Sequence, residues 1–244
     1  MSPKSHTLFH FTSNIDTLKL ILENGFWPRF CLEDVKWLKY PGFDFIAYPM
    51  VCFCDIPLSR VNEHVSFYGE YGLGLTKEWA VRNGITPVQY ISDKSNIPQA
   101  YRELSDIVSE HATKTEQGYK IIRHMLAHAK PLNGQMNSND NTVERDFVQE
   151  SEWRLIANNT NYPDHLNKAK FEDSDKLQQF NEQTRVHSMC QVVPNDIKYI
   201  FVKQDADIPT VVNFIQEHLG GHSGDDIKLL VSRVISLETI QRDI

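Results

Sequence analysis

Three groups of residues in this chain have types and spacing that could do chemistry, and the first is centred on a histidine. His10 lies in the segment Phe9-His-Phe-Thr12, where alternating side chains predict a strand over residues 7–12. Residues two apart on a strand project to the same face, so His10 and Thr12 could both hydrogen-bond a hydroxyl group of a bound molecule. A histidine between aromatic residues is equally typical of a satisfied group in a protein core. The sequence leaves both interpretations open.

The second group is a pair of acidic residues, Glu150 and Glu152, two positions before Arg154. At the start of a strand predicted over residues 152–157, the two carboxylates would point to one face. One carboxylate could then stabilise a cationic transition state while the other orients a nucleophile. The alternative is a solvated strand end, and Arg154 could neutralise the pair, which favours a structural role.

The third group is an aromatic segment, Tyr68-Gly-Glu-Tyr71, followed by Gly72-Leu-Gly-Leu75. A strand with glycine at alternate positions has one face without side chains, so another group must approach that face closely. A tyrosine ring beside an unobstructed backbone suits the stacking of an aromatic ligand. Tight packing against a neighbouring strand explains the same pattern.

The cysteines form no recognisable metal or disulfide pattern. Cys52 and Cys54 project to one face of a strand predicted over residues 50–54, but no second cysteine pair or histidine pair completes a zinc site. Cys31 and Cys190 are isolated, and four cysteines in 244 residues are too few for a disulfide framework. We therefore expect reduced thiols and no bound metal.

The elements that must position these groups alternate along the whole chain. Gly25 ends a first predicted helix. Residues 26–48 are predicted to be loop with short elements, and the Asn-, Gly- and Ser-rich residues 130–142 are predicted to be a mobile loop. Further strands are predicted over 87–91, 197–202 and 228–232, and further helices over 58–67, 79–83, 98–111, 115–128 and 209–219. Without a repeat or a linker, this order predicts one α+β domain over residues 1–244, with the helices of 98–128 as an insertion.

Composition narrows the class of protein. The chain carries 25 Lys and Arg against 32 Asp and Glu, a net charge of −7, and 41% of its residues are hydrophobic, enough for a real core. Its apolar runs are far shorter than the ~20 residues of a bilayer span, and its first residues lack the apolar middle of a secretory signal. We expect a cytosolic protein without membrane contact. Binding to nucleic acid would require a local basic patch.

In chain order, the three groups resemble the histidine, tyrosine and glutamate arrangement of the ADP-ribosyltransferases. The motifs are most similar to those of the AbiGi family of phage-abortive-infection proteins, over about Leu8 to Arg154. The resemblance implies split mixed and antiparallel sheets with flanking helices.

The resemblance also implies a role for each matching residue. In that superfamily the histidine bonds the ribose of NAD, the tyrosine packs on the nicotinamide, and the glutamate stabilises the ribosyl cation as nicotinamide leaves. The matching residues are His10, Phe11 and Thr12 for the ribose, Tyr68 or Tyr71 for the nicotinamide, and Glu152 for the cation. Glu150 matches a position that orients the acceptor, and Arg60 or Arg29 could bind the diphosphate.

The implied function is NAD-dependent transfer of ADP-ribose to a macromolecule, either nucleic acid or protein. Such an enzyme would be the toxin of an anti-phage defence system, would need no metal, and would be held in check by an antitoxin or another regulatory partner protein. Two alternatives stay open. The chain could be a non-catalytic antitoxin or binding module that retains the fold, or an NAD glycohydrolase that uses water as the acceptor.

Overall fold

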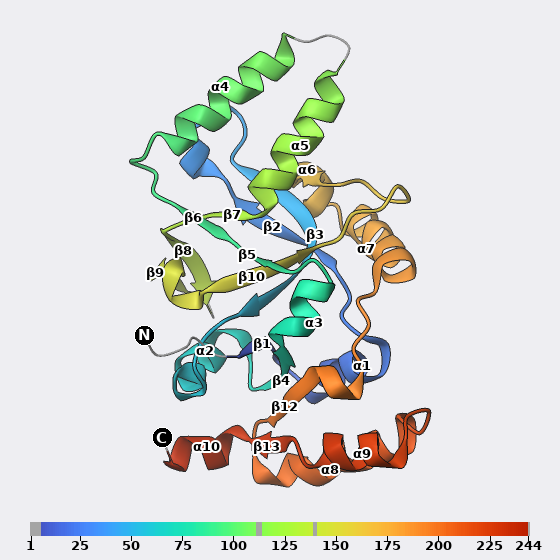
Figure 1. The fold of residues 1–244 in the computed structure, drawn as a ribbon. Coiled ribbons are helices and arrows are strands. Elements are labelled where there is room, and N and C mark those ends of the chain that lie inside the picture. The colour runs from blue at the N-terminus through green and yellow to red at the C-terminus, as the bar shows by residue number, and fades with distance from the viewer. Residues whose placement is uncertain (1–5, 111–113, 139–140, 244) are drawn as a thin grey trace. The chain divides into compact units, whose positions relative to one another are not determined.

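The structure is a computed structural model that describes residues 6–110, 114–138 and 141–243. Its internal contacts divide the chain into two compact units built from separate segments. Unit 1 comprises residues 1–26, 52–85 and 190–244, and unit 2 comprises residues 27–51 and 86–189. Both units contain helices and strands, which confirms the predicted α+β class (Figure 1). The single domain over residues 1–244 stays a prediction.

Unit 1 is built on a mixed sheet with the strand order β13-β12-β4-β1. These strands span Val234–Ser236, Ile197–Val202, Tyr71–Thr76 and Thr7–Thr12. β1 pairs antiparallel with β4, and also with the end of β3 (Phe45–Cys54) through Phe9 and Cys54. The strands predicted over residues 7–12 and 197–202 are confirmed with the same bounds.

The helices of unit 1 include α1, which begins after Asn14 and ends at Gly25. The Asn14 side chain accepts a hydrogen bond from the Thr17 amide, and Gly25 has a φ of 83°, which favours glycine. The helices are α1 (Ile15–Asn24), α2 (Val61–Tyr68), α3 (Lys77–Arg82), α8 (Ile208–His218), α9 (Gly224–Val231) and α10 (Leu237–Asp243).

The strand predicted over residues 228–232 is wrong, because residues 228–231 lie in α9, Ser232 is the residue after its end, and the strand β13 begins at Val234. The side chain of Ser223 accepts a hydrogen bond from the Asp226 amide at the start of α9. This cap stabilises a helix over a short apolar run that fits either kind of element.

The glycine-spaced strand β4 owes its bare face to tight packing against β1. A Cβ atom on Gly72 would lie 2.5 Å from the carbonyl oxygen of His10 and 2.6 Å from the ring of Phe11. A Cβ atom on Gly74 would contact side chains of β1 and of Tyr199. The packing interpretation therefore accounts for this glycine pattern.

Unit 2 is organised around the first part of β3, which pairs antiparallel with β2 (Arg29–Asp34) and β11 (Leu166–Asn167). The order continues from β3 to β10 (Glu152–Ile156) and β5 (Thr86–Pro87). The segment 26–48, predicted as loop with short elements, holds two strands among its loop residues, namely β2 and the start of β3. The charged residues in this segment obscured its strand pattern, because β2 is only partly buried.

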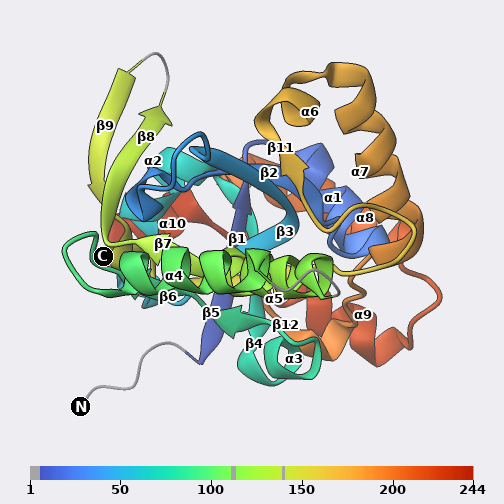
Figure 2. The same cartoon turned by 90° about the horizontal axis from the view of Figure 1, so that it is seen from above.

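The helices of unit 2 include the predicted pair, which the structure confirms as α4 (Ile97–Ser109) and α5 (Thr115–Ala127). The predicted end of the first helix, His111, lies outside the described residues. The pair α6 (Lys168–Glu172) and α7 (Ser174–Ser188) lies on one side of α5, and the hairpin β8–β9 on the other (Figures 1 and 2).

The segment predicted as a mobile loop, residues 130–142, instead forms strands. β7 (Ala129–Pro131) pairs with β6 (Gln89–Ile91), and β8 (Asn133–Ser138) pairs with β9 (Asn141–Asp146) in an antiparallel hairpin. Residues 139–140 of this segment lie outside the described residues. Polar composition favours a loop, but a hairpin needs few apolar residues because the hydrogen bonds between its two strands hold it together.

The packing of β4 makes a prediction about stability. We expect Gly72→Ala to lower the free energy of unfolding by about 1–3 kcal/mol, because the added methyl group overpacks the contact with β1. Gly220→Ala is the matched control and should change it little, because a methyl group added there would have no described atom within 4 Å. Urea unfolding of both variants measures the difference, and an unchanged Gly72→Ala variant would contradict the packing of β4.

Candidate functional site

The two glutamates of the predicted site lie side by side in unit 2, but a strand is not what brings them together. Glu150 ends a short 3-10 helix (Phe147–Glu150), and Glu152 begins β10. Ser151 between them has a φ of 45°, in the left-handed region that an L-residue rarely adopts. This turn, rather than strand alternation, directs the two carboxylates toward a common partner.

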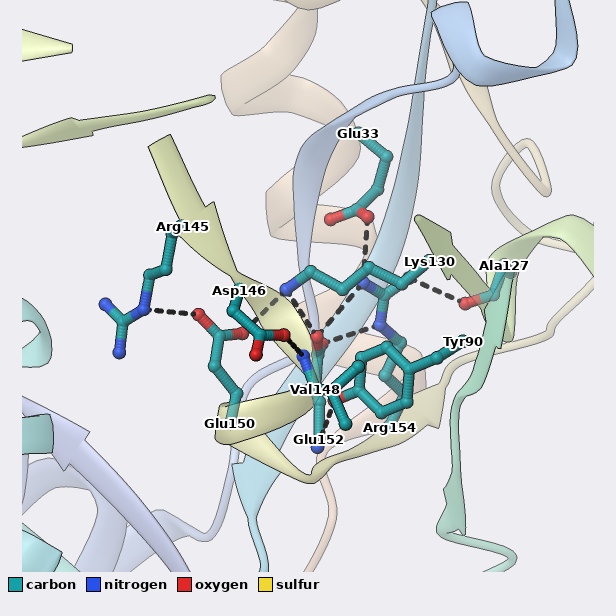
Figure 3. A network of polar contacts seen from close by, with 10 residues as sticks. All are labelled: Glu33, Tyr90, Ala127, Lys130, Arg145, Asp146, Val148, Glu150, Glu152 and Arg154. Carbon is teal, nitrogen blue, oxygen red and sulfur yellow. Dashed lines mark hydrogen bonds and ion pairs between the residues drawn. The ribbon is translucent and has the colours of Figure 1, made fainter. Parts of the chain in front are cut away.

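That partner is Lys130 of β7 (Figure 3). Its Nζ atom donates to Oε2 of Glu150 at 2.8 Å and to Oε2 of Glu152 at 2.7 Å. Glu150 is 2% exposed and Glu152 is 5% exposed. Both glutamates are therefore buried, and they do not form a solvated strand end. The shared ammonium group offsets the repulsion between two buried like charges.

Arg154 is the second cation on Glu152 and is itself completely buried. Its Nε atom donates to Oε1 of Glu152 at 2.6 Å, and its Nη2 atom donates to Oε2 at 3.3 Å. The same Nη2 atom binds Glu33 of β2 at 2.8 Å, and Nη1 donates to the carbonyl of Ala127 at 2.9 Å. The planar guanidinium therefore ties β10 to β2 and to the end of α5.

The charges of this cluster balance. Three carboxylates, those of Glu33, Glu150 and Glu152, are joined by ion pairs to three cations, Lys130, Arg154 and Arg145 of β9. A buried ion cluster is tolerated only when its charges are paired and hydrogen-bonded, as they are here. We call these six residues the ion cluster.

The ion cluster shifts the titration of its members. Burial alone would raise the pKa of Glu152, but Arg154 and Lys130 outweigh burial and lower that pKa to about 2. Burial opposes the charged form of Lys130, yet Glu152 and Glu150 raise its pKa well above the usual lysine value. Glu152 and Lys130 are therefore both charged at neutral pH.

The amide of Glu152 also has a partner, which completes its fixation. It donates to the hydroxyl oxygen of Tyr90 at 2.7 Å. With the main chain held by Tyr90 and the side chain held by Arg154 and Lys130, Glu152 has one fixed orientation. Each of its carboxylate oxygens accepts a hydrogen bond from within the protein.

The predicted ribose-binding histidine lies in unit 1 and has the environment of a core residue. Its Nδ1–H group donates to the carbonyl of Cys52 at 2.8 Å, and its ring packs edge-on against Phe26. Burial lowers the pKa of His10, although the hydrogen bond to Cys52 partly opposes this. His10 is therefore neutral at pH 7. Phe11 beside it is buried in the core of unit 1, and Thr12 is partly exposed at the end of β1.

The predicted nicotinamide-binding tyrosines, also in unit 1, contact other residues of that unit. The ring of Tyr68 stacks on His64 with 4.3 Å between centroids and lines a surface hollow that also contains Glu70. The Tyr71 hydroxyl donates to Asp207 at 3.1 Å. Arg60 forms an exposed ion pair with Glu63 at 3.4 Å.

The predicted site is thus divided between the units. His10, Phe11, Thr12, Arg60, Tyr68 and Tyr71 belong to unit 1, whereas Glu150 and Glu152 belong to unit 2, as does Arg29, which lies over the ring of Trp27. Within unit 2 the glutamates are brought together, as predicted. The site as a whole stays a prediction.

Sequence reasoning missed Lys130, Glu33 and Tyr90, which complete the surroundings of Glu152. Lys130 lies 22 residues before Glu152 in the chain, and Tyr90 lies 62 residues before it. Among the residues around Glu152, only Arg154 lies close enough in the sequence, two positions away, to be identified from local spacing. A lysine in an otherwise uncharged stretch of residues 129–138 was the one hint that the sequence offered for Lys130.

Among residues 6–110, 114–138 and 141–243, no group of three or more His, Cys, Asp or Glu side chains is placed to hold a metal ion. In the same ranges, no helix is both long and apolar enough to cross a bilayer.

The protein belongs to the α+β class, and its unit 2 contains the ion cluster, in which three carboxylates balance three cations. A family model described as "Putative abortive phage resistance protein AbiGi, antitoxin" matches residues 24–203. The chain therefore belongs to the AbiGi family. The abortive phage resistance protein AbiGi of Lactococcus lactis subsp. cremoris is 26% identical over 250 aligned positions, which cover 90% of this chain and 99% of that protein. No solved structure matches the chain.

The lowered pKa of Glu152 predicts a specific dependence of stability on pH. Because the folded-state pKa lies near 2 and the ordinary value is 4.5, ionised Glu152 stabilises the fold above pH 4.5, and this contribution is lost as the pH falls toward 2. We expect Glu152→Gln to lower the free energy of unfolding most near neutral pH, and the difference from the unmutated protein to shrink in acid. Urea unfolding at several pH values measures it.

The matched control is Glu116→Gln, which removes an exposed carboxylate on α5. It should leave the stability almost unchanged at every pH, because the Glu116 side chain is 84% exposed and water solvates its charge. A pH-independent difference for Glu152→Gln would mean that Glu152 is not held as an ionised group.

Proposed function

We propose that this AbiGi protein is a non-catalytic component of an abortive phage-resistance system that acts by binding a partner protein, as an antitoxin binds its toxin. The phage-resistance context is supported by the AbiGi family and by the Lactococcus lactis relative, which is an abortive phage resistance protein, and the description of the family as an antitoxin supports a protein partner.

The observation that carries this proposal is the environment of Glu152. A carboxylate that stabilises a developing ribosyl cation must face the position where that charge appears. Both oxygens of Glu152 instead accept hydrogen bonds from Arg154 and Lys130 within the protein. An approaching substrate would have to displace a buried ion pair, which is costly because it leaves the released charges without partners.

The residues matched to NAD binding give the same indication. His10 already donates to the Cys52 carbonyl, and Tyr71 already donates to Asp207. Both residues therefore have structural partners within unit 1, which fits a role in the fold of that unit.

ADP-ribosyl transfer from NAD to nucleic acid or protein is the second candidate, with NAD glycohydrolysis as its variant. One observation favours it: Glu152 is held in the ionised form, which transition-state stabilisation requires. In that case the ion cluster would have to rearrange so that Glu152 exchanges a cation of the protein for the substrate.

Labelled NAD separates the two candidates. We expect purified protein incubated with adenylate-labelled NAD and a bacterial extract to give no label in RNA, DNA or protein, and no nicotinamide release above the extract alone. The assay is repeated with Glu152→Gln and with the control Glu116→Gln. Label that appears with the unmutated protein and with Glu116→Gln, but falls about 100-fold in Glu152→Gln, would establish the transferase and overturn the proposal.

A further inference from the structure

The helices α4 and α5 of unit 2 run antiparallel as a hairpin that carries exposed apolar side chains (Figure 1). Leu104 and Ile107 of α4 are 36% and 55% exposed, and Ile121 and Met125 of α5 are 56% and 47% exposed. These fractions are high for large apolar residues. Residues three or four apart share one face of a helix, so each pair lies together on its own helix. We call these four residues the apolar strip.

A hollow of about 380 Å³ joins the two halves of the apolar strip. Ile107 and Ile121 both line it, together with Val108 and Gly118. A Cβ atom on Gly118 would lie 2.6 Å from a methyl carbon of Val108, so the two helices approach closely at this point. The surface therefore offers protruding apolar side chains beside a depression that can receive one, as surfaces that pack against each other do.

The exposed charges differ in sign between the two helices. Over residues 97–110 the exposed ionisable side chains are all acidic, and Arg102, which is partly buried, donates to the carbonyl of Leu38. Over residues 114–127 one exposed acid, Glu116, is paired with Arg123 of the same helix, and the others are basic. The acidic residues of α4 and its end are Glu103, Asp106 and Glu110, and the basic residues of α5 and its start are Lys114, Lys120 and His124.

Both kinds of charge border the apolar strip near the hollow. Glu103 lies four residues before Ile107 and Glu110 lies three residues after it, so both carboxylates neighbour Ile107 on the surface of α4. Lys114 lines the hollow together with Ile107 and Ile121. The strip thus has an acidic edge on α4 and a basic edge on α5.

The basic edge continues along α5 beside Met125. Lys120 and His124 line a second hollow with Met125. Asp164 also lines it, but the Asp164 carboxylate is held by Arg123 at 2.8 Å and by His165 at 2.9 Å. Lys120 therefore gives this side of the strip a net positive charge.

We propose that the apolar strip is the contact surface of a homodimer, in which α4 of each copy lies over α5 of the other. A two-fold axis parallel to the helices produces this arrangement, and the four helices form a bundle. The two apolar strips then cover each other, and the acidic edge of α4 meets the basic edge of α5 twice. An axis perpendicular to the helices would instead place α4 on α4, with acidic edge against acidic edge.

The level of the charged residues along the hairpin agrees with this arrangement. Val108 lies beside Gly118, and Glu110 and Lys114 both lie beyond that contact, toward the loop that joins the helices. A two-fold axis parallel to the helices keeps each residue at its level. Glu110 of one copy therefore faces Lys114 of the second copy.

The net charge of the chain sets the conditions of the test. Two copies that each carry −7 repel each other at long range. At about 0.15 M salt this repulsion is screened beyond about 8 Å, whereas charges in contact are screened less. The proposal concerns the surface of unit 2 and does not rest on the proposed function.

Sedimentation equilibrium of the full chain at this salt concentration measures the dimer directly. The mass of one chain is 28.3 kDa, and we expect twice this mass as the concentration rises to about 200 μM. Ile121→Glu should weaken dimerisation at least about tenfold, because the new carboxylate would be buried against the second copy. Val186→Glu is the matched control on α7, where the side chain is 70% exposed, and it should leave the affinity within about twofold.

A charge exchange tests whether the occupant is a second copy in the proposed orientation. Glu110→Lys alone and Lys114→Glu alone each place like charges opposite each other twice, and each should weaken its own dimer about tenfold. A mixture of the two variants should recover the affinity to within about threefold, because both contacts of the mixed dimer pair opposite charges. Neither change opposes its helix, since a cation suits the end of α4 and an anion suits the start of α5. Circular dichroism checks that every variant folds.

Three results would overturn the proposal. A chain that stays monomeric up to about 200 μM would leave the strip to a different protein. A dimer that Ile121→Glu does not weaken would have its contact elsewhere. A mixture of Glu110→Lys and Lys114→Glu that dimerises no better than either variant alone would contradict the placement of α4 over α5.

Discussion

The constraint on which unit 2 depends is the sharing of one ammonium group by two buried carboxylates. Lys130 lies between Glu150 and Glu152, with Nζ–O distances of 2.8 and 2.7 Å. Without it, two like charges would face each other away from water, which is strongly unfavourable. Because Lys130 belongs to β7, the pairing also fixes the short strand from which the β8–β9 hairpin continues.

Arg154 extends the same constraint to the rest of unit 2. Its three contacts join Glu152 of β10, Glu33 of β2 and the last turn of α5. Removing one member would leave a buried charge without a partner, which typically costs about 3–5 kcal/mol. Buried ion clusters contribute less to stability than apolar packing of similar volume. They can instead specify one arrangement of the strands and helices that carry them, and we infer that the ion cluster has this role in unit 2.

The sequence predicted local features of the fold and site and missed long-range ones. The strand at residues 7–12 and the pairing of Arg154 with Glu152 follow from spacing within a few residues, and both agree with the structure, although Arg154 does not pair with Glu150 as well. The left-handed turn at Ser151 has no signal in residue type, and the partnership of Lys130 with Glu152 depends on the pairing of β6 with β7. The helix α9 was mistaken for a strand because its apolar run is too short to show a period.

The difference between local and long-range features also decides what the sequence can predict about function. Types and order of residues can suggest a catalytic histidine, tyrosine and glutamate, because these signals are local. Whether a carboxylate is available for chemistry depends on its partners, and for Glu152 the partners are Arg154 and Lys130. A residue can therefore match a catalytic motif in type and position while its side chain serves the interior of the protein.

The most direct measurement is the titration of the Glu152 side chain by NMR of its ¹³C-labelled carboxyl group, assigned with Glu152→Gln. A carboxylate held by Arg154 and Lys130 should stay ionised until the pH approaches about 2, with a chemical shift that does not respond to added NAD. Titration near the ordinary glutamate value of 4.5, or a shift on addition of NAD, would contradict the account, because it would show that the carboxylate is free to meet a substrate.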